Sequence, residues 1–155
     1  VNFSAQTLQR DDVVTRVRRA LERTAFDPSR VVVEITESRL LIDDGPWMAS
    51  LAQLRADHLR LAVDDFGTGY SGFSYLQQVR PDLLKIDRSF VAALDSNDRK
   101  PLSTIEAIVR MAHAHGVSVV AEGVETHAHA LQLRAIGCDY AQGWLYGRPQ
   151  PWSVV

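Results

Sequence analysis

The sequence has few cysteines and no long apolar run, and each shortage argues against a class of protein. Cys138 is the only cysteine among the 155 residues, so no disulfide can form within the chain, and a cytoplasmic location is expected. A longer parent protein can still be anchored in a membrane. No apolar run approaches the ~18 residues of a membrane-spanning helix. We therefore expect no membrane contact by this segment.

Excess charge of either sign is also absent. The sequence contains seventeen Lys and Arg residues and nineteen Asp and Glu residues, and its formal net charge is −2. This balance gives no electrostatic reason to expect DNA or RNA polymers as partners. Glycine-rich phosphate loops of the dinucleotide and P-loop types are missing too. With 46% hydrophobic and 23% charged residues, the chain has the composition and length of a single globular domain.

Short apolar segments alternate with helical patterns along the chain. Six strands are expected near Val1–Ser4, Val31–Thr36, Leu59–Asp64, Leu83–Asp87, Val117–Glu122 and Asp139–Gln142. Five helices are expected around Val13–Leu21, Trp47–Leu54, Tyr75–Val79, Pro101–Ala112 and Thr126–Ile136. Asp11 or Asp12 can cap the first helix, Pro101 suits the start of the fourth, and Gly116 can end it. This alternation predicts an α/β fold with a parallel sheet and crossover helices.

Two architectures fit the alternation, an open doubly wound sheet and a (β/α) barrel. The absence of glycine-rich loops weakens the first. Five strands end in polar residues after an apolar run: Glu34, Asp64 with Asp65, Lys85, Glu122 and Gln142. Barrels build their active sites from the carboxyl ends of several strands, and a full barrel takes about 250 residues. The sequence therefore predicts an incomplete (β/α)8 barrel, with about six of eight strands and its N-terminal units missing.

Strand parity allows these residues to share one mouth. Residues two apart lie on the same strand face, which places Glu34 with Thr36 and Glu122 with Val120. Asp65 has the opposite parity from Asp64, so the turn that begins there must re-aim its side chain. The glycines at positions 67 and 69 make a sharp turn easy.

Clustered carboxylates indicate a site for hard cations. Glu34, Asp64, Asp65 and Glu122 would repel one another at one mouth unless cations neutralised them. All-oxygen ligands favour Mg²⁺ or Mn²⁺ over Zn²⁺, and Asn2 can add a neutral oxygen. Two such ions about 3.5–4 Å apart activate water and clamp a phosphoester.

Each candidate also has an ordinary structural interpretation. A lone carboxylate at a strand end is commonly a helix cap or an ion-pair partner, and Glu125 is best explained as a first-turn acid of the next helix. Lys85 alone would be a surface lysine, although at a phosphoryl-transfer site it can orient the attacking water. The histidines are expected to be solvated rather than zinc ligands: His58, His113, His115, His127 and His129. Cys138 is expected to be a small buried hydrophobe.

Six motifs in consistent order carry a family resemblance. They are VNFS, VVVEITES, DDFGTGYS, LLKIDRSF, VVAEGVET and GCDYAQGWLYGRP, and they span nearly the whole chain. Together they resemble the EAL family of cyclic di-GMP phosphodiesterases. The resemblance implies a modified (β/α)8 barrel with one antiparallel strand. It also implies hydrolysis of cyclic di-GMP to linear pGpG with Mg²⁺ or Mn²⁺, and two ions are expected.

The resemblance also assigns roles to single residues. It implies Asn2, Glu34, Asp64 and Asp65 as metal ligands, with Glu122 binding metal directly or through water. It implies that Lys85 contacts the nucleophilic water and that Gln142 helps to position this assembly. Glu37 matches the glutamate that steadies the loop after Asp65, a loop implicated in homodimer formation. Apart from these assigned roles, the aromatic rings of Trp144 and Tyr146 can pack either beside guanine or at the barrel rim, and Arg148 can contact phosphate or guanine.

One family feature does not occur in this sequence. The name-giving Glu-Ala-Leu, whose glutamate is a metal ligand in the family, is absent, as is the substrate-binding arginine that follows it. We therefore expect residues 1–155 to be the C-terminal two-thirds of one EAL domain, with phosphodiesterase activity in the parent protein. Two alternatives stay open: a catalytically inactive receptor for cyclic di-GMP, and a dimer-forming regulatory module.

Overall fold

The structure is a computed structural model and describes residues 1–36, 47–68, 74–96 and 98–150. It divides into two compact units, residues 1–84 and 85–155. Strands are hydrogen-bonded in the order in which they follow along the chain, and every recorded strand pairing is parallel. Among the described residues, no helix has the length and apolar character needed to cross a membrane.

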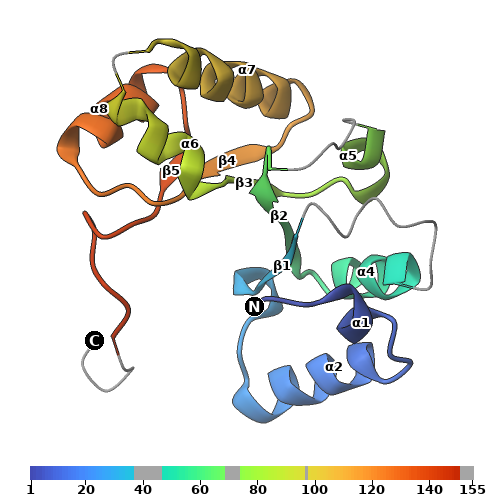
Figure 1. Cartoon of the computed structure of the whole chain (residues 1–155). Helices are drawn as coiled ribbons and strands as arrows, with labels where there is room; N and C mark the ends of the chain where they lie inside the picture. Colours follow the sequence, from blue (N-terminus) through green and yellow to red (C-terminus); the bar gives the residue numbers. More distant parts are fainter. Residues whose placement is uncertain (37–46, 69–73, 97, 151–155) are drawn as a thin grey trace. The chain divides into compact units, whose positions relative to one another are not determined.

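The first unit alternates helices and strands (Figure 1). In chain order it contains α1 (Ala5–Leu8), α2 (Val13–Thr24), the 3-10 turn η1 (Pro28–Arg30), β1 (Val32–Thr36), α4 (Trp47–Ala56), β2 (Arg60–Phe66) and α5 (Ser74–Val79). β1 and β2 are parallel, with Val32 opposite Arg60 and Thr36 opposite Asp64. The strand expected at residues 1–4 is reduced to one isolated bridge at Asn2.

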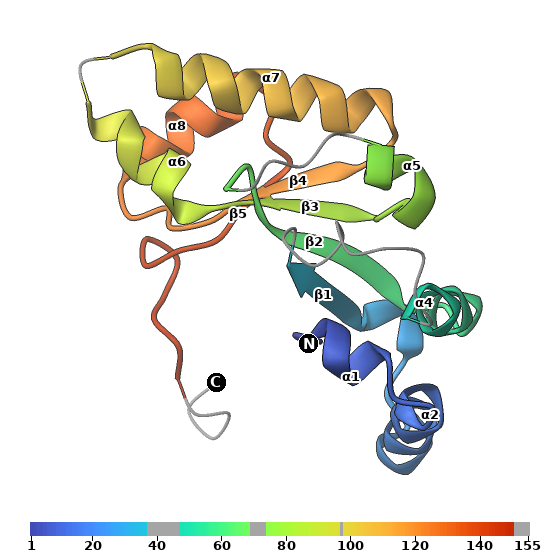
Figure 2. The same ribbon diagram turned by 45° about the vertical axis from the view of Figure 1, so that its right-hand side comes forward.

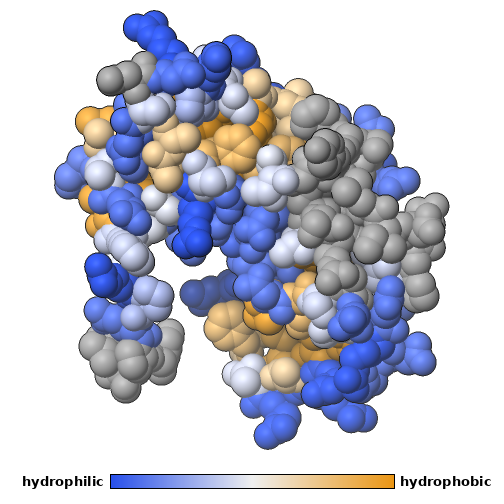
Figure 3. Space-filling view, in the orientation of Figure 1, coloured by the Kyte–Doolittle hydropathy of each residue, from blue (hydrophilic) through white to orange (hydrophobic). Residues whose placement is uncertain are grey.

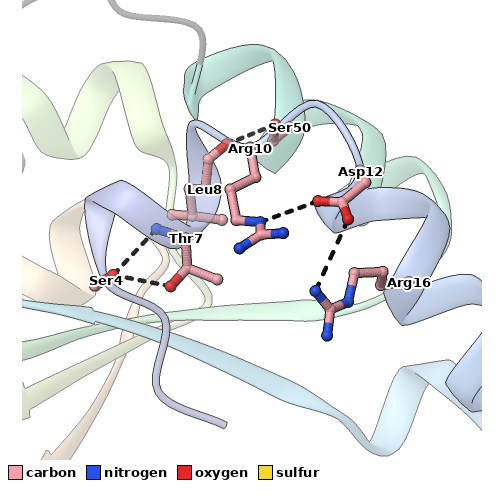
Figure 4. Close-up of polar contacts among 7 residues, drawn as sticks. All are labelled: Ser4, Thr7, Leu8, Arg10, Asp12, Arg16 and Ser50. Atoms are coloured by element: carbon pink, nitrogen blue, oxygen red, sulfur yellow. Dashed lines mark hydrogen bonds and ion pairs between the residues drawn. The ribbon is translucent and has the colours of Figure 1, made fainter.

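α2 begins without the side-chain cap that the sequence predicts. Asp12 occupies the N-cap position but makes no side-chain cap hydrogen bond. Its carboxylate instead accepts a hydrogen bond from Arg10 Nε at 3.1 Å and lies 3.8 Å from Arg16 Nη1 (Figure 4). The Arg10 hydrogen bond lowers the pKa of the Asp12 carboxyl group. Two flanking arginines therefore replace the backbone cap that the sequence predicts.

Helix α4 packs as the sequence predicts and fastens both preceding helices. Its Trp47, Leu51 and Leu54 are buried. Ser50 Oγ donates a hydrogen bond to the Leu8 carbonyl oxygen in α1 at 2.9 Å (Figure 4). The Asp57 carboxylate just after α4 accepts two hydrogen bonds from Arg18 of α2, at 2.7 and 3.1 Å.

An apolar groove of about 520 Å³ lies between α2 and the strands of the first unit. Val17 and Leu21 from α2 line it opposite Val31 and Val33. Figure 3 shows apolar side chains gathered on this part of the surface. The predicted apolar face of α2 is thus only partly buried, because Val13 and Val14 enter the core while the later residues face the groove.

The second unit continues the same alternation. It contains the second half of β3 (Leu83–Ile86), then α6 (Arg88–Ala92), the 3-10 turn η2 (Ala93–Asp95), α7 (Lys100–Ala114), β4 (Ser118–Ala121), α8 (His127–Ala135) and β5 (Tyr140–Ala141). α6, α7 and α8 lie on the same side of β4 and β5 (Figures 1 and 2). Ile105, Val109 and Leu133 are at most 1% exposed and form the core beneath these helices.

The helix boundaries in the second unit confirm the predicted signals. Pro101 lies in the first turn of α7, where a missing N–H costs nothing. Gly116 follows α7 with a φ of 72°, a left-handed conformation that suits glycine. Thr126 caps α8 by accepting a hydrogen bond from the backbone N–H of His129 at 3.1 Å. The α/β class is confirmed, although the strands are in general shorter than expected.

His129 contradicts the expectation of solvated histidines, whereas His113 is exposed as expected. His129 is only 4% exposed, and its Nε2 lies 2.8 Å from Asp95 Oδ1. His113 Nε2 lies 2.8 Å from Asp139 Oδ2, and the imidazole must be the donor because a carboxylate only accepts. Cys138 is half-buried, and burial raises the pKa of its thiol. The His129 contact joins α8 to η2, and the His113 contact joins α7 to the residue that precedes β5.

Asp139 makes the stability of the second unit depend on pH. Burial alone would raise the pKa of its carboxyl group, but hydrogen bonds from His113 and from the Val119 backbone N–H outweigh burial and lower the pKa. Its stabilising effect is therefore full above the unfolded pKa of about 4 and is lost as pH falls through the lower folded value. We expect Asp139→Asn to weaken the fall in the free energy of unfolding at acidic pH, measured by urea unfolding over a series of pH values. An unchanged fall at acidic pH would contradict this role of Asp139.

Candidate functional site

Asn2 and Glu34 lie side by side on neighbouring strand segments of the first unit. Asn2 forms a parallel bridge with Glu34. Glu34 N–H donates to the Val1 carbonyl at 2.9 Å, and its own carbonyl accepts from Phe3 N–H at 3.0 Å. The two hydrogen bonds fix the register, so a slip of one residue would turn Asn2 away from the Glu34 face.

Asp64 follows on the next strand. The β1–β2 register sets Glu34 opposite Ala62 and Thr36 opposite Asp64. Ala62 and Asp64 share a strand face, so Asp64 lies on the face of Glu34, one pleat nearer the carboxyl end. On β1, Val33 and Ile35 on the other face are buried, while Glu34 is half-buried. The first unit thus aligns an amide and two carboxylates on neighbouring strands.

Asp65 reaches its position by a local backbone distortion. Its φ is 57°, in the left-handed region that Asp tolerates better than most residues. Its N–H donates to Asp64 Oδ1 at 3.1 Å, and its carbonyl accepts from Thr68 Oγ1 at 2.9 Å. The sequence correctly indicated a turn here, but the unusual dihedral falls on Asp65 itself as well as on Gly67.

Lys85 and Glu122 form an ion pair inside the second unit. Lys85 in β3 is only 7% exposed, and its Nζ lies 2.7 Å from Glu122 Oε1. Glu122 follows β4, and its N–H donates to the Ile86 carbonyl at 3.1 Å. A buried ammonium group is costly without a hydrogen-bonded partner. The surface-lysine interpretation is therefore wrong.

Backbone hydrogen bonds hold Gln142 beside the turn that follows β4. Its N–H donates to the Ala121 carbonyl at 2.8 Å, and its carbonyl accepts from Val124 N–H at 3.0 Å. Leu145 N–H then donates to the Val124 carbonyl at 3.1 Å. At Gly143, between these bonds, any side chain would collide with the Val124 backbone. The turns after β4 and β5 are thereby joined.

Two further acids near the strand ends are Glu37 and Asp87. Glu37 lies outside the described residues. Asp87 in the KID motif caps α6, accepting a hydrogen bond from Ser89 N–H at 2.9 Å. Burial opposes the shift, but the Ser89 hydrogen bonds lower the pKa of the Asp87 carboxyl group. The structural role of this acid explains why a charged residue follows Lys85 so closely.

A cavity of about 700 Å³ opens beside Glu122 and Gln142 within the second unit. Its wall includes Glu125, Trp144 and Arg148. It also includes Arg88, which the sequence analysis did not single out, although its place just past a strand end was a usable signal. The second unit thus places Glu122 and Gln142 on the wall of one cavity.

Comparison with known proteins decides the family. The sequence profile of the EAL domain matches residues 1–149. The chain belongs to the EAL domain family. This confirms the resemblance carried by the six motifs.

Curated EAL relatives are much longer than this chain. MucR of Pseudomonas aeruginosa, a bifunctional diguanylate cyclase/cyclic di-GMP phosphodiesterase, is 40% identical over 151 residues, which are 97% of this chain and 22% of MucR. NbdA of the same organism, a cyclic di-GMP phosphodiesterase, is 38% identical over 155 residues, which are 100% of this chain and 20% of NbdA. The chain therefore spans about one fifth of these relatives.

Solved EAL structures share the fold. The PaMucR phosphodiesterase in complex with c-di-GMP has a TM-score of 0.91 at 39% identity, covering 99% of this chain and 62% of that one. BlrP1 of Klebsiella pneumoniae, in complex with manganese and cyclic di-GMP, has a TM-score of 0.86 at 30% identity, covering 96% of this chain and 38% of that one. The predicted fold class is confirmed by these matches.

Proposed function

We propose that this EAL chain serves metal-dependent hydrolysis of cyclic di-GMP to linear pGpG in the full-length protein. The observation that carries the proposal is the alignment of Asn2, Glu34 and Asp64 on neighbouring strands of a chain with the EAL fold. MucR and NbdA, which share the family, are cyclic di-GMP phosphodiesterases. The BlrP1 complex holds manganese together with cyclic di-GMP.

The donor set fits Mg²⁺ or Mn²⁺. Neighbouring carboxylates and an amide oxygen are ligands that hard divalent cations prefer, and no thiol takes part. Asn2, Glu34, Asp64 and Asp65 would hold two ions, with Glu122 as a further ligand directly or through water. Bound ions supply charge neutralisation at the phosphate and acidify a water molecule.

The remaining residues act on the proton and on the phosphate charge. Lys85 Nζ lies 2.7 Å from Glu122 Oε1, and the Lys85 ammonium group would contact the attacking water and stabilise negative charge that develops on the phosphoryl oxygens. Gln142, fixed through its backbone, positions this assembly. The steadying role of Glu37 and homodimer formation through the loop after Asp65 stay predictions, because Glu37 and residues 69–73 lie outside the described residues.

The test is a direct assay of pGpG formation. We expect the full-length protein to convert cyclic di-GMP to pGpG with Mg²⁺ or Mn²⁺ and to lose this activity in EDTA. Asp64→Asn removes the ligand charge while keeping the shape, and we expect a loss of at least about a hundredfold in kcat. Chromatography of the reaction products over time measures both effects.

Asp98→Asn is the matched control, because Asp98 is an exposed acid with a side chain 53% accessible. We expect it to retain full activity. Absence of pGpG with both metals would overturn the proposal. Binding of intact cyclic di-GMP in that case would support the receptor alternative instead.

A further inference from the structure

The turn that follows β4 lies directly against the first residue of α6. β3 leads into α6 (Figure 2), and Arg88 is the first residue of that helix. A Cβ added to Gly123 in the turn would meet Arg88 Cβ at 2.6 Å and Arg88 Cα at 3.3 Å. Carbon atoms in favourable contact lie about 3.5–4.0 Å apart. Only a hydrogen atom therefore fits at position 123, and we call this close approach the Gly123–Arg88 contact.

The turn is held in place on both sides of Gly123. Glu122 N–H donates to the Ile86 carbonyl oxygen at 3.1 Å, and Val124 N–H donates to the Gln142 carbonyl oxygen at 3.0 Å. The Val124 side chain is also completely buried. The turn cannot move away from α6 without breaking one of these hydrogen bonds or exposing Val124.

The start of α6 is held as well. The Asp87 carboxylate caps the helix by accepting a hydrogen bond from Ser89 N–H at 2.9 Å. Val91, one turn further on, is completely buried and attaches the helix to the core. Arg88 Cβ therefore has a defined place, and a group added at position 123 would displace the turn rather than the helix.

This turn carries Glu122, which pairs with Lys85. Glu122 directly precedes Gly123, and its Oε1 lies 2.7 Å from Lys85 Nζ. Lys85 lies three residues before Arg88, so the Gly123–Arg88 contact joins the two chain segments that carry the ion pair. A displacement of about 1 Å at reacting groups can cost a hundredfold in rate. The contact is therefore close enough to the ion pair to affect turnover.

We propose that Gly123 is a positioning residue, whose missing side chain lets the turn lie on Arg88 and so sets Glu122 against Lys85. The inference rests on the proposed hydrolytic function, in which Glu122 and Lys85 take part. Arg88 contributes to this contact through its Cα and Cβ atoms and not through its guanidinium group. A methyl group added at position 123 should therefore be tolerated when the Cβ of Arg88 is removed.

The first measurement is the steady-state kinetics of pGpG formation by the full-length protein. We expect Gly123→Ala to lower kcat about tenfold to a hundredfold. KM should stay within about twofold, because the change acts on the ion pair that serves the reaction. Gly116→Ala is the matched control, since φ is 72° at Gly116 and 71° at Gly123 but a Cβ at Gly116 meets no atom within 4 Å. It should keep kcat within about twofold, because it adds the same backbone strain without the contact.

Substitutions of Arg88 test whether the effect passes through the contact. Arg88→Gly removes the Cβ, so the double variant Gly123→Ala/Arg88→Gly should recover a kcat within about threefold of Arg88→Gly alone. Arg88→Ala removes the same guanidinium group but keeps the Cβ, and Gly123→Ala/Arg88→Ala should stay slow. Rescue in both double variants, or in neither, overturns the inference. Should Gly123→Ala fail to fold, the two double variants decide by the same criterion.

Crystal structures of the folded variants give a measurement that does not depend on turnover. We expect the distance between Lys85 Nζ and Glu122 Oε1 to exceed hydrogen-bonding range in Gly123→Ala and to return to 2.7 Å in the variant rescued by Arg88→Gly. An unchanged distance overturns the inference.

The outcomes separate this inference from the proposed function. Formation of pGpG by the unaltered protein, together with normal kcat in folded Gly123→Ala, removes only the inference. Absence of pGpG from the unaltered protein, together with the expected shift of the ion pair in the crystal structures, removes only the hydrolytic proposal.

Discussion

Replacing Lys85 by Met should abolish turnover and destabilise the protein at the same time. The substitution removes the ammonium group and leaves Glu122 half-buried without its partner at 2.7 Å. Removing one member of a buried ion pair costs about 3–5 kcal/mol. Loss of a donor directed at developing negative charge costs about a hundredfold to a thousandfold in kcat. Urea unfolding and the pGpG assay measure the two effects.

The double variant Lys85→Met/Glu122→Gln separates stability from catalysis. Neutralising Glu122 removes the negative charge that Lys85 balanced, so we expect part of the unfolding free energy to return while turnover stays lost. Lys100 is the only other lysine in the chain, and its side chain is 89% exposed. Lys100→Met is therefore the control. Near-normal kcat in Lys85→Met would show that Lys85 serves stability alone.

Gly143→Ala should be the most damaging single-methyl change in the second unit. The added Cβ would collide with the backbone nitrogen and oxygen of Val124. Relief requires the turns after β4 and β5 to separate, which breaks the hydrogen bonds that Val124 makes with Gln142 and Leu145. Overpacking and the two lost bonds together should cost about 3 kcal/mol or more. We also expect kcat to fall, because Gln142 moves away from Glu122.

Gly116→Ala is the comparison, since a Cβ there meets no atom within 4 Å. Its φ of 72° is unfavourable for alanine, so a cost of about 1–2 kcal/mol with normal kcat is expected. Urea unfolding and steady-state kinetics distinguish the two glycines. Equal effects of the two substitutions on stability and on kcat would mean that the contact between the two turns does not position Gln142.

Local patterns were sufficient for most of the secondary structure. Trp47, Leu51 and Leu54 repeat at helical spacing, and all three are buried in α4. Pro101 and Gly116 bracket α7 as expected. The cap at Asp12 failed because Arg10 and Arg16 compete for the same carboxylate, a choice that helix signals alone do not resolve.

The polar residues show where local patterns stop being informative. His129 is buried because Asp95, 34 positions away, accepts a hydrogen bond from it. Lys85 is buried because Glu122 neutralises it. Both residue types are ordinarily solvated, so spacing along the chain gives no reason to bury them. Arg88 lies just past a strand end, which was a usable signal, but the cavity that it lines is formed by several separate turns and appears only in the folded chain.

The sequence by itself determined the strand–helix alternation, the oxygen-rich strand ends and the family motifs, because each is a property of neighbouring residues. Only the tertiary structure decided that Asn2 pairs with Glu34, that Lys85 meets Glu122, and that Arg148 stacks on Trp144 in a cavity beside Gln142. Strand register and the burial of charge depend on contacts between distant segments. Those contacts form only when the chain is folded, and periodicity does not encode them.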